Sequence, residues 1–325
     1  MMEKFNIRRI AVIGAGIMGH GIAQVCALIG YETIVTRRRK ELFKETYEQI
    51  KSNMKVLIEN EIITGDEAEA ALSRIEFKET ISDAVKDVDF VFEAVVENMD
   101  VKKSVFREID QASPHHTILA SNTSTFSITE LASVTRRPEK VVGTHWWNPP
   151  YLMPLVEIVK GEKTSPETIE VTRNLILNLG KVPVVCKDTP GFLGVRLQAT
   201  LVIEAISMLE QGIASAEDID TAVKMTLGLR LPILGPLEIV DLGGMDTFLY
   251  AYTYLYNTLG EKFRLPDLLK RKVELGELGI KTGKGFYTYT SESIRAAIKR
   301  RDEWLIEQLK SRGLLKPRRK PTENK

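Results

Sequence analysis

The chain has 325 residues, of which 43% are hydrophobic and 27% are charged. These are ordinary values for a globular protein, and the length is sufficient for two domains. The formal net charge of +1 gives no reason to expect a nucleic-acid or anionic-membrane partner. We find no apolar run of 18 or more residues, so no transmembrane helix is expected, and no metal site is predicted.

The start of the chain and its cysteines both bear on the cellular compartment. Residues 1–7 lead directly into a predicted strand at 8–13, without the apolar core of a signal peptide. Cys26 and Cys186 lie in apolar segments and predict buried free thiols rather than a disulfide. Both features predict a cytoplasmic protein.

The first half of the chain alternates between strand and helix patterns. Short β-type runs are separated by helix-length segments, and one of those helices is predicted over Pro166–Leu179. The predicted strands are 8–13, 32–36, 88–97, 116–124, 139–147, 154–159 and 181–186. This alternation predicts βα units and an α/β fold with a mostly parallel sheet.

The second half has a different pattern. From residue 192 to about 272 it is helical, with Ser215 as the predicted N-cap of one helix. One amphipathic helix follows residue 289, and the basic tail KPRRKPTENK is predicted to be disordered. We therefore predict a sheet domain at 1–188, an all-helical domain at 189–290, and a helix with a basic tail at 291–325.

A glycine-rich turn follows the first predicted strand. In GAGIMG, residues Gly14, Gly16 and Gly19 have the G-x-G-x-x-G spacing between a strand and a helix. The first glycine permits a tight turn, the second lets a pyrophosphate approach the backbone, and the third allows close helix–strand packing. The pyrophosphate would bind at the helix N-terminus, beside Ile17 and Met18. The motif predicts a Rossmann-type domain that binds a dinucleotide.

Three arginines follow the second predicted strand, where such folds meet the adenosine ribose. Arg37 lies 23 residues after Gly14, and no acidic residue occurs between Thr33 and Lys40. A carboxylate at this place binds the ribose 2′-hydroxyl of NAD, whereas an arginine accommodates the 2′-phosphate of NADP. We predict that Arg37, with Arg38 or Arg39, binds the 2′-phosphate and that NADP is preferred, with NAD as the alternative. A solvated charge run at the start of a helix would give the same pattern.

A histidine and a glutamate form the second candidate site. His145 ends a predicted buried strand at its carboxyl end, the edge where open α/β sheets bind ligands. Glu157 lies in an otherwise apolar strand, and a buried carboxylate needs a partner. The two residues make sense as a base oriented by an anion, although an unrelated core histidine and a surface glutamate remain possible.

Seven segments together resemble the 3-hydroxyacyl-CoA dehydrogenase family over residues 7–290. They are GAGIMGHGIAQ, EAVVENMDVK, ASNTS, GTHWWNPPYLMPLVEIV, CKDTPGF, GPLEIVDLGGMDT and KTGKGFYTY. The resemblance implies a Rossmann domain followed by a helical domain that usually forms a homodimer. It also implies hydride transfer between a nicotinamide cofactor and a (3S)-3-hydroxyacyl-CoA, here expected to be a short-chain 3-hydroxybutyryl-CoA of fatty acid metabolism.

The resemblance also implies roles for individual residues. His145 matches the catalytic base, Glu157 the carboxylate that orients it, and Ser124 the residue that hydrogen-bonds the substrate oxygen. The positions that match cofactor contacts are Glu97, Lys102 and Lys281, and those that match substrate or coenzyme A contacts are Asn148, Asn53 and Lys55.

Three features depart from the family pattern. Position 37 usually carries Asp or Glu in the family, Val195 replaces an active-site Asn, and Trp146–Trp147 stand where two Phe residues are common. The Pro-Pro pair that follows resembles CoA-independent β-hydroxyacid dehydrogenases of the L-gulonate and carnitine types. Such an enzyme is the alternative function, and a non-catalytic dinucleotide-binding protein is a second one.

Overall fold

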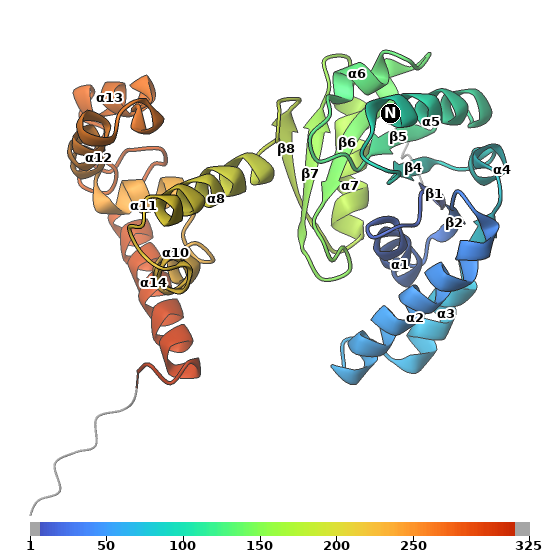
Figure 1. Cartoon of the computed structure of the whole chain (residues 1–325), viewed down its shortest axis with the longest axis horizontal. Coiled ribbons are helices and arrows are strands. Elements are labelled where there is room, and N and C mark those ends of the chain that lie inside the picture. Colours follow the sequence, from blue (N-terminus) through green and yellow to red (C-terminus); the bar gives the residue numbers. More distant parts are fainter. Residues whose placement is uncertain (1–6, 316–325) are drawn as a thin grey trace, which may run out of the picture. The chain divides into compact units, whose positions relative to one another are not determined.

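The computed structural model describes residues 7–315 and forms, within them, one eight-stranded sheet (Figure 1). The strand order is β3-β2-β1-β4-β5-β6-β7-β8. All neighbours are parallel except β6 and β7, which are antiparallel. The strands are β1 (Arg9–Ile13), β2 (Glu32–Thr36), β3 (Ile75–Lys78), β4 (Phe90–Glu93), β5 (Ile118–Ser121), β6 (Val141–Trp146), β7 (Leu155–Lys160) and β8 (Val182–Lys187).

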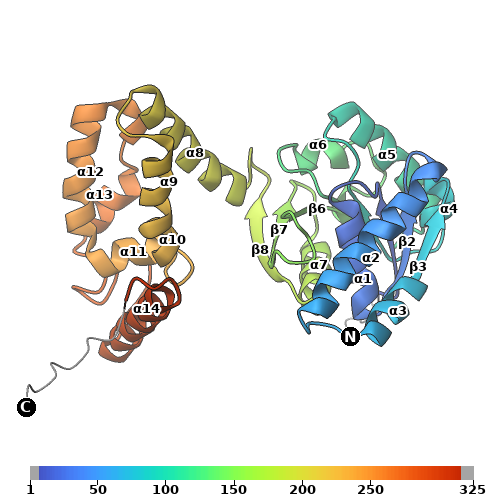
Figure 2. The same cartoon turned by 60° about the horizontal axis from the view of Figure 1, so that its bottom comes forward.

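Helices cover both faces of this sheet (Figure 2). α1 and α7 pack on one face, while α4, α5 and α6 pack on the other, each against its own buried cluster. Strand residues alternate between the two clusters: Ile10 and Val12 belong to the first, and Ala11 and Ile13 to the second. The helices up to the end of the sheet are α1 (Gly19–Ile29), α2 (Phe43–Glu59), α3 (Gly65–Ser73), α4 (Ile81–Val85), α5 (Met99–Ala112), α6 (Ile128–Ala132) and α7 (Pro166–Asn178), with 3-10 turns η1 (Lys40–Leu42) and η2 (Pro138–Lys140).

The helix ends follow local sequence signals. Asn98 caps α5 by accepting a hydrogen bond from the Val101 backbone N–H, and Ser165 caps α7, which has proline at its first position. α1 ends at Gly30, whose φ of 110° lies in the left-handed region. These signals fix where α5 and α7 start and where α1 ends.

The remainder of the described chain is helical, as predicted. Its helices are α8 (Gly194–Glu210), α9 (Ala216–Met225), α10 (Leu227–Arg230), α11 (Pro236–Gly243), α12 (Met245–Leu259), α13 (Asp267–Glu274) and α14 (Ser291–Ser311), with η3 (Glu261–Phe263). Ser215 caps α9 by accepting from the Asp218 N–H, which confirms that prediction. Buried Asp241 accepts hydrogen bonds from the N–H groups of Phe286 and Tyr287, which ties the segment after α13 to α11.

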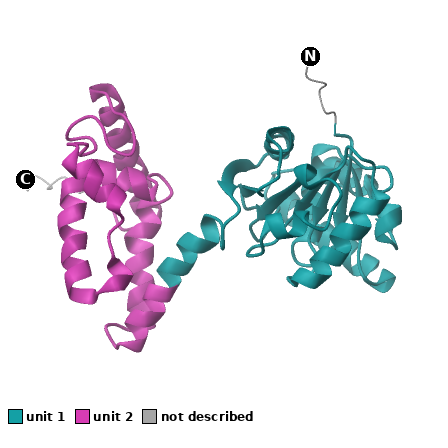
Figure 3. Cartoon of the chain, turned by 90° about the horizontal axis from the view of Figure 1, so that it is seen from above, with its two compact units in different colours: residues 1–202 teal, residues 203–325 magenta. Residues whose placement is uncertain are grey.

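Contacts divide the chain into units of residues 1–202 and 203–325 (Figure 3). This division falls within α8, so the boundary predicted at residues 188 and 189 stays a prediction. The tail expected to be disordered, 316–325, lies outside the described residues. Within the described part of the chain, no helix is both long enough and apolar enough to span a membrane.

The sequence predictions missed one strand, and the prediction for one cysteine is wrong. β3 was not predicted, because four residues with partly exposed side chains give little apolar signal. Cys26 is buried as expected, but Cys186 is only partly buried. The reason is that β8 is the last strand of the sheet, so its side chains are covered less completely than those of central strands.

Candidate active site

The glycine-rich turn has the geometry that its spacing predicts. Gly14 has a φ of 94°, and a Cβ there would come 2.7 Å from the carbonyl oxygen of Ala94. A Cβ on Gly19 would come 1.8 Å from the Gly14 carbonyl oxygen, so only glycine permits this close packing. In contrast, no atom lies within 4 Å of the place where a Cβ on Gly16 would stand. The backbone is therefore open to a ligand at Gly16, just before α1. Ile17 is exposed and Met18 is partly buried in the same turn.

A pocket of about 930 Å³ opens beside this turn. It lies between the carboxyl ends of β1 and β4, where the strand order reverses and where open α/β sheets bind ligands. Apolar side chains of α4 and α5 form one wall, among them Ile81, Val101 and Val105. The pocket thus combines an open glycine backbone with an apolar wall, which fits the adenosine half of a dinucleotide.

The three predicted arginines all line this pocket, but they differ in their contacts. Arg37 donates to the carbonyl oxygen of Leu42 at 3.2 Å and to the hydroxyl of Thr46 at 3.0 Å, and its other terminal nitrogen lies 3.4 Å from Glu45. Arg38 and Arg39 are exposed, and their side chains have no hydrogen bond or ion pair among the described residues. Arg37 is therefore built into the start of α2, whereas Arg38 and Arg39 are free to meet a ligand.

His145 and Glu157 meet across the only antiparallel pairing of this sheet, in which they are directly opposite. The Nδ1 atom of His145 lies 2.6 Å from a carboxylate oxygen of Glu157, and both side chains are buried. The other carboxylate oxygen accepts hydrogen bonds from the N–H groups of Leu193 and Gly194, at 2.9 and 3.0 Å. Nδ1–H therefore donates to Glu157, which leaves Nε2 of His145 for another partner.

The environment of Glu157 keeps it ionised. Burial by itself would raise the pKa of this carboxyl, but the hydrogen bond from His145 and the N–H groups of Gly194 and Leu193 outweigh it and lower the pKa. An anion so placed stabilises a protonated imidazole and holds the ring in one orientation. The pair has the arrangement of a histidine that accepts and returns a proton.

Ser124 lies in the loop after β5, and this loop is fixed to the end of β6. The side-chain oxygen of Asn122 accepts a hydrogen bond from the Trp146 N–H at 2.9 Å, next to His145 in the chain. The Ser124 N–H donates to Glu97 at 3.0 Å, while its hydroxyl has no hydrogen bond among the described residues. The hydroxyl is thus available to a ligand at the carboxyl edge of the sheet.

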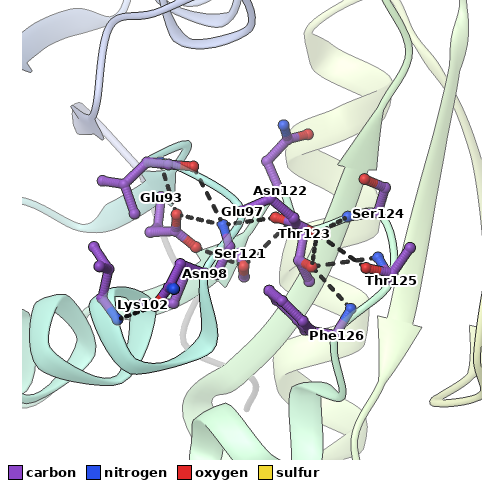
Figure 4. A network of polar contacts seen from close by, with 12 residues as sticks. Glu93, Glu97, Asn98, Lys102, Ser121, Asn122, Thr123, Ser124, Thr125 and Phe126 are labelled. Carbon is purple, nitrogen blue, oxygen red and sulfur yellow. Dashed lines mark hydrogen bonds and ion pairs between the residues drawn. The ribbon is translucent and has the colours of Figure 1, made fainter.

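A polar network joins this loop to the segment after β4 (Figure 4). Glu97 accepts hydrogen bonds from the Thr123 hydroxyl at 2.5 Å and from Ser124, and lies 3.2 Å from the Lys102 Nζ. Lys102 is buried and also pairs with Glu93 at 2.8 Å. Of the two predicted cofactor residues, Glu97 therefore contacts the Ser124 loop directly, and Lys102 is joined to it through Glu97.

Comparisons with known proteins agree with this geometry. The 3-hydroxyacyl-CoA dehydrogenase NAD-binding domain matches residues 9–189, and the 3-hydroxyacyl-CoA dehydrogenase C-terminal domain matches residues 191–289. The chain belongs to the 3-hydroxyacyl-CoA dehydrogenase family. The resemblance predicted from the sequence is confirmed, and so is the Rossmann-type fold followed by a helical domain.

Three relatives of this dehydrogenase illustrate the range of the family. The probable 3-hydroxybutyryl-CoA dehydrogenase of Deinococcus radiodurans is 40% identical over 86% of this chain and 100% of its own length. The solved 3-hydroxyacyl-CoA dehydrogenase of Archaeoglobus fulgidus is 36% identical, with a TM-score of 0.78 over 95% of this chain and 100% of its own. A 5-formyl-3-hydroxy-2-methylpyridine 4-carboxylate 5-dehydrogenase of Mesorhizobium japonicum is 34% identical over 89% of this chain and 93% of its own.

The remaining predicted site residues of this dehydrogenase have contacts of their own. Asn53 on α2 donates to Gln24 of α1 at 3.1 Å, and Lys55 is exposed on the same helix. Asn148 is exposed three residues after His145. Lys281 belongs to the unit 203–325, where its Nζ contacts Asp246 at 2.7 Å and Thr247 at 3.1 Å.

Two contacts at the histidine were not predicted from the sequence. The rings of Trp147 and Phe192 lie 5.3 and 5.8 Å from the His145 ring, centroid to centroid. A Cβ on Gly194 would come 2.3 Å from the indole of Trp147, so glycine is required where α8 begins. Val195 follows in the first turn of α8. The contacts of Phe192 with His145 and of Gly194 with Trp147 gave no signal in the sequence, because each joins residues 47 positions apart.

Proposed function

We propose that this dehydrogenase interconverts a (3S)-3-hydroxyacyl-CoA, such as 3-hydroxybutyryl-CoA, and the corresponding 3-ketoacyl-CoA, with His145 as the acid/base. The observation that carries the proposal is the buried His145–Glu157 pair at the carboxyl edge of the sheet, 2.6 Å apart. The glycine turn and the pocket beside it fit a nicotinamide dinucleotide. The relatives named 3-hydroxybutyryl-CoA dehydrogenase support the substrate class.

Each residue of the pair has a defined part in the reaction. The bound nicotinamide cofactor supplies the hydride acceptor in oxidation and the donor in reduction. In oxidation, Nε2 of His145 accepts the proton of the C3 hydroxyl, and in reduction the imidazolium returns it. Glu157 stabilises the imidazolium, and the Ser124 hydroxyl donates a hydrogen bond to the same substrate oxygen. Asn148 and Asn53 are proposed to contact the acyl-CoA.

An assay of substrate choice tests this function. We expect acetoacetyl-CoA to drive oxidation of the reduced cofactor much faster than free β-keto acids do. Faster turnover of the free acids would instead support a CoA-independent dehydrogenase, the alternative that Val195 and the Mesorhizobium relative favour. No turnover of either class, with the cofactor still bound, would support a non-catalytic dinucleotide-binding protein.

We also propose that NADP(H) is preferred over NAD(H), through Arg38 with Arg37 and Arg39. Arg38 is exposed, lines the pocket and has no partner among the described residues. One acid, Glu79, lines the pocket beside the arginines, and it pairs with Lys40. Charge-assisted hydrogen bonds to the 2′-phosphate would favour NADP(H) by roughly 10- to 10³-fold in kcat/KM. A comparison of NADPH with NADH tests this, and equal efficiency would contradict it.

We further propose a homodimer that forms through the helical part of the chain. α8 exposes several apolar side chains, among them Leu197, Ile203 and Ile206. Exposed apolar stripes of this kind are typical of subunit interfaces. Sedimentation equilibrium should give twice the chain mass, and a monomer at all concentrations would contradict the proposal.

A further inference from the structure

The buried ion pair of Glu93 and Lys102 contacts Glu97 and has no part in the proton transfer proposed above. The side chains of Glu93 and Lys102 are 0% and 1% exposed. The carboxylate of Glu93 accepts three hydrogen bonds, from Lys102 and the Val95 N–H at 2.8 Å each and from the Ser121 hydroxyl at 2.6 Å. This buried carboxylate is therefore hydrogen-bonded to three groups of the protein, one of them a cation.

The ammonium of Lys102 is shared between two carboxylates. Its Nζ lies 2.8 Å from Glu93, 3.2 Å from Glu97 and 3.5 Å from the Val95 carbonyl oxygen, so all three of its N–H groups have acceptors (Figure 4). Burial by itself would raise the pKa of Glu97, but the Thr123 hydroxyl and the charge of Lys102 outweigh it and lower the pKa. Glu93 and Glu97 therefore face the same cation.

The charges of this network do not cancel. One cation and two carboxylates leave a charge of −1. Because Glu93 and Lys102 are buried, solvent screens their charges only weakly. The net negative charge therefore acts on groups near Glu97, whose side chain is 39% exposed. Glu97 also holds the Ser124 N–H, so the excess negative charge lies at the loop that carries the proposed substrate contact.

We propose that Glu93 is a positioning residue that fixes this network at −1 and thereby makes the site bind the oxidised nicotinamide cofactor more tightly, relative to the reduced one. The inference rests on the proposed function, in which the Ser124 hydroxyl binds the oxygen on the carbon that exchanges hydride with the nicotinamide. Glu97 holds the Ser124 N–H, so in that function it lies close to the nicotinamide ring. The oxidised ring carries one positive charge and the reduced ring carries none. A fixed negative charge beside the ring therefore distinguishes the two forms, whereas a neutral network would not.

The test is a set of cofactor dissociation constants, measured without substrate, for each variant. Protein fluorescence or calorimetry gives Kd for the oxidised and reduced forms of NADP and NAD. In Glu93→Gln the network becomes neutral, and we expect the ratio of oxidised to reduced Kd to rise by roughly 3- to 30-fold, the effect of one partly screened charge. In Lys102→Gln the network carries −2, and the ratio should fall instead.

Two further variants separate charge from packing. The double variant Glu93→Gln/Lys102→Gln retains Glu97 alone and returns to −1, so its ratio should return toward that of the wild type. Ser121→Ala removes the hydrogen bond to Glu93 but no charge, and its ratio should not change. A loss of local order would weaken both cofactor forms alike, and it could not change the sign of the effect between the two single variants.

The possible outcomes are distinct. An unchanged ratio in Glu93→Gln, with both forms still bound, would overturn the inference and leave the proposed function intact. If the unmodified protein bound no nicotinamide cofactor, the proposed function itself would fail. If Glu93→Gln does not fold, Glu97→Gln removes one charge at a partly exposed position, and an unchanged ratio there would overturn the inference equally.

Discussion

At the residue scale, the proposed chemistry depends on the hydrogen bonds that orient the His145 ring and leave its Nε2 for the substrate. Its Nδ1 is bonded to Glu157, and Glu157 is in turn held by two backbone N–H groups at the start of α8. His145→Ala should lower kcat by roughly 10²–10⁴, because general acid–base catalysis contributes about that factor. Stopped-flow turnover with acetoacetyl-CoA measures the loss. Cofactor affinity serves as the control and should stay near that of the wild type.

Glu157→Gln should lower kcat in the same direction, because the imidazolium loses its counter-charge while the shape of the side chain is kept. A variant with near wild-type turnover would exclude the orienting role of Glu157. Circular dichroism is needed alongside, because Glu157 also holds the start of α8.

Substitutions of Arg37 and Arg38 distinguish a role in cofactor binding from a role in stability. Arg37 bonds to the Leu42 carbonyl and Thr46, whereas Arg38 has no such contact among the described residues. Arg38→Ala should therefore reduce the NADPH preference without changing the thermal midpoint. Arg37→Ala should reduce the NADPH preference and also lower the thermal midpoint. The loss of its hydrogen bonds should lower the unfolding free energy by about 1 kcal/mol. If Arg38→Ala left the ratio of kcat/KM for NADPH and NADH unchanged, the phosphate role would belong elsewhere.

At the element scale, the start of α8 contacts both Glu157 and the Trp147 ring beside His145. The backbone N–H groups of Leu193 and Gly194 bind Glu157, and Gly194 lies against the indole of Trp147. Gly194→Ala would place a Cβ 2.3 Å from Trp147 and must displace one of them. We expect a loss of about 1–3 kcal/mol in unfolding free energy and a lower kcat. Thr200→Ala, an exposed change in the same helix, is the matched control and should alter neither.

A substitution of Val195, in the first turn of α8, tests whether this turn contacts the substrate. Val195→Asn would restore the polar group that the family usually carries there. If that contact is simply missing, kcat/KM on acyl-CoA substrates should rise by up to about tenfold, the worth of one neutral hydrogen bond. A clear fall would indicate a pocket shaped around an apolar residue and would favour the CoA-independent alternative.

Elements with a local signal were predictable, and contacts between distant segments were not. β2 was predicted at its observed bounds, and the glycine spacing located the turn before α1. The His145–Glu157 pairing was suggested because a buried carboxylate needs a partner, but its register depends on how β6 and β7 pair. The buried pairing of Glu93, and the hydrogen bonds of Arg37 to Leu42 and Thr46, could not be read from the sequence. Both depend on partners from other elements, which composition and periodicity do not reveal.

At the scale of the whole molecule, the sheet collects functional groups that the chain keeps far apart. The glycine turn follows β1, the arginines follow β2, Glu97 follows β4, Ser124 follows β5 and His145 lies near the end of β6. Parallel strands place all these ends at one edge, so the stability of the sheet and the integrity of the site are coupled. Buried carboxylates contribute to the stability of the sheet and to the site. Because these carboxylates titrate, the stability of the fold depends on pH.

Acid should therefore unfold this dehydrogenase through its buried carboxylates, and Asp110 offers the clearest test. Burial would raise the pKa of Asp110, but hydrogen bonds from Arg136 and Arg137 outweigh it and lower the pKa below its usual value. A lowered pKa gives stability that is present above the unfolded-state pKa near 4 and is lost as pH falls through the folded-state value. Asp110→Asn should lower the unfolding free energy by about 3 kcal/mol at pH 7, because the buried guanidinium of Arg137 loses its counter-charge. Its unfolding free energy, measured in urea between pH 7 and 3, should decline less steeply than that of the wild type. Parallel declines would show that Asp110 is not a source of the acid sensitivity.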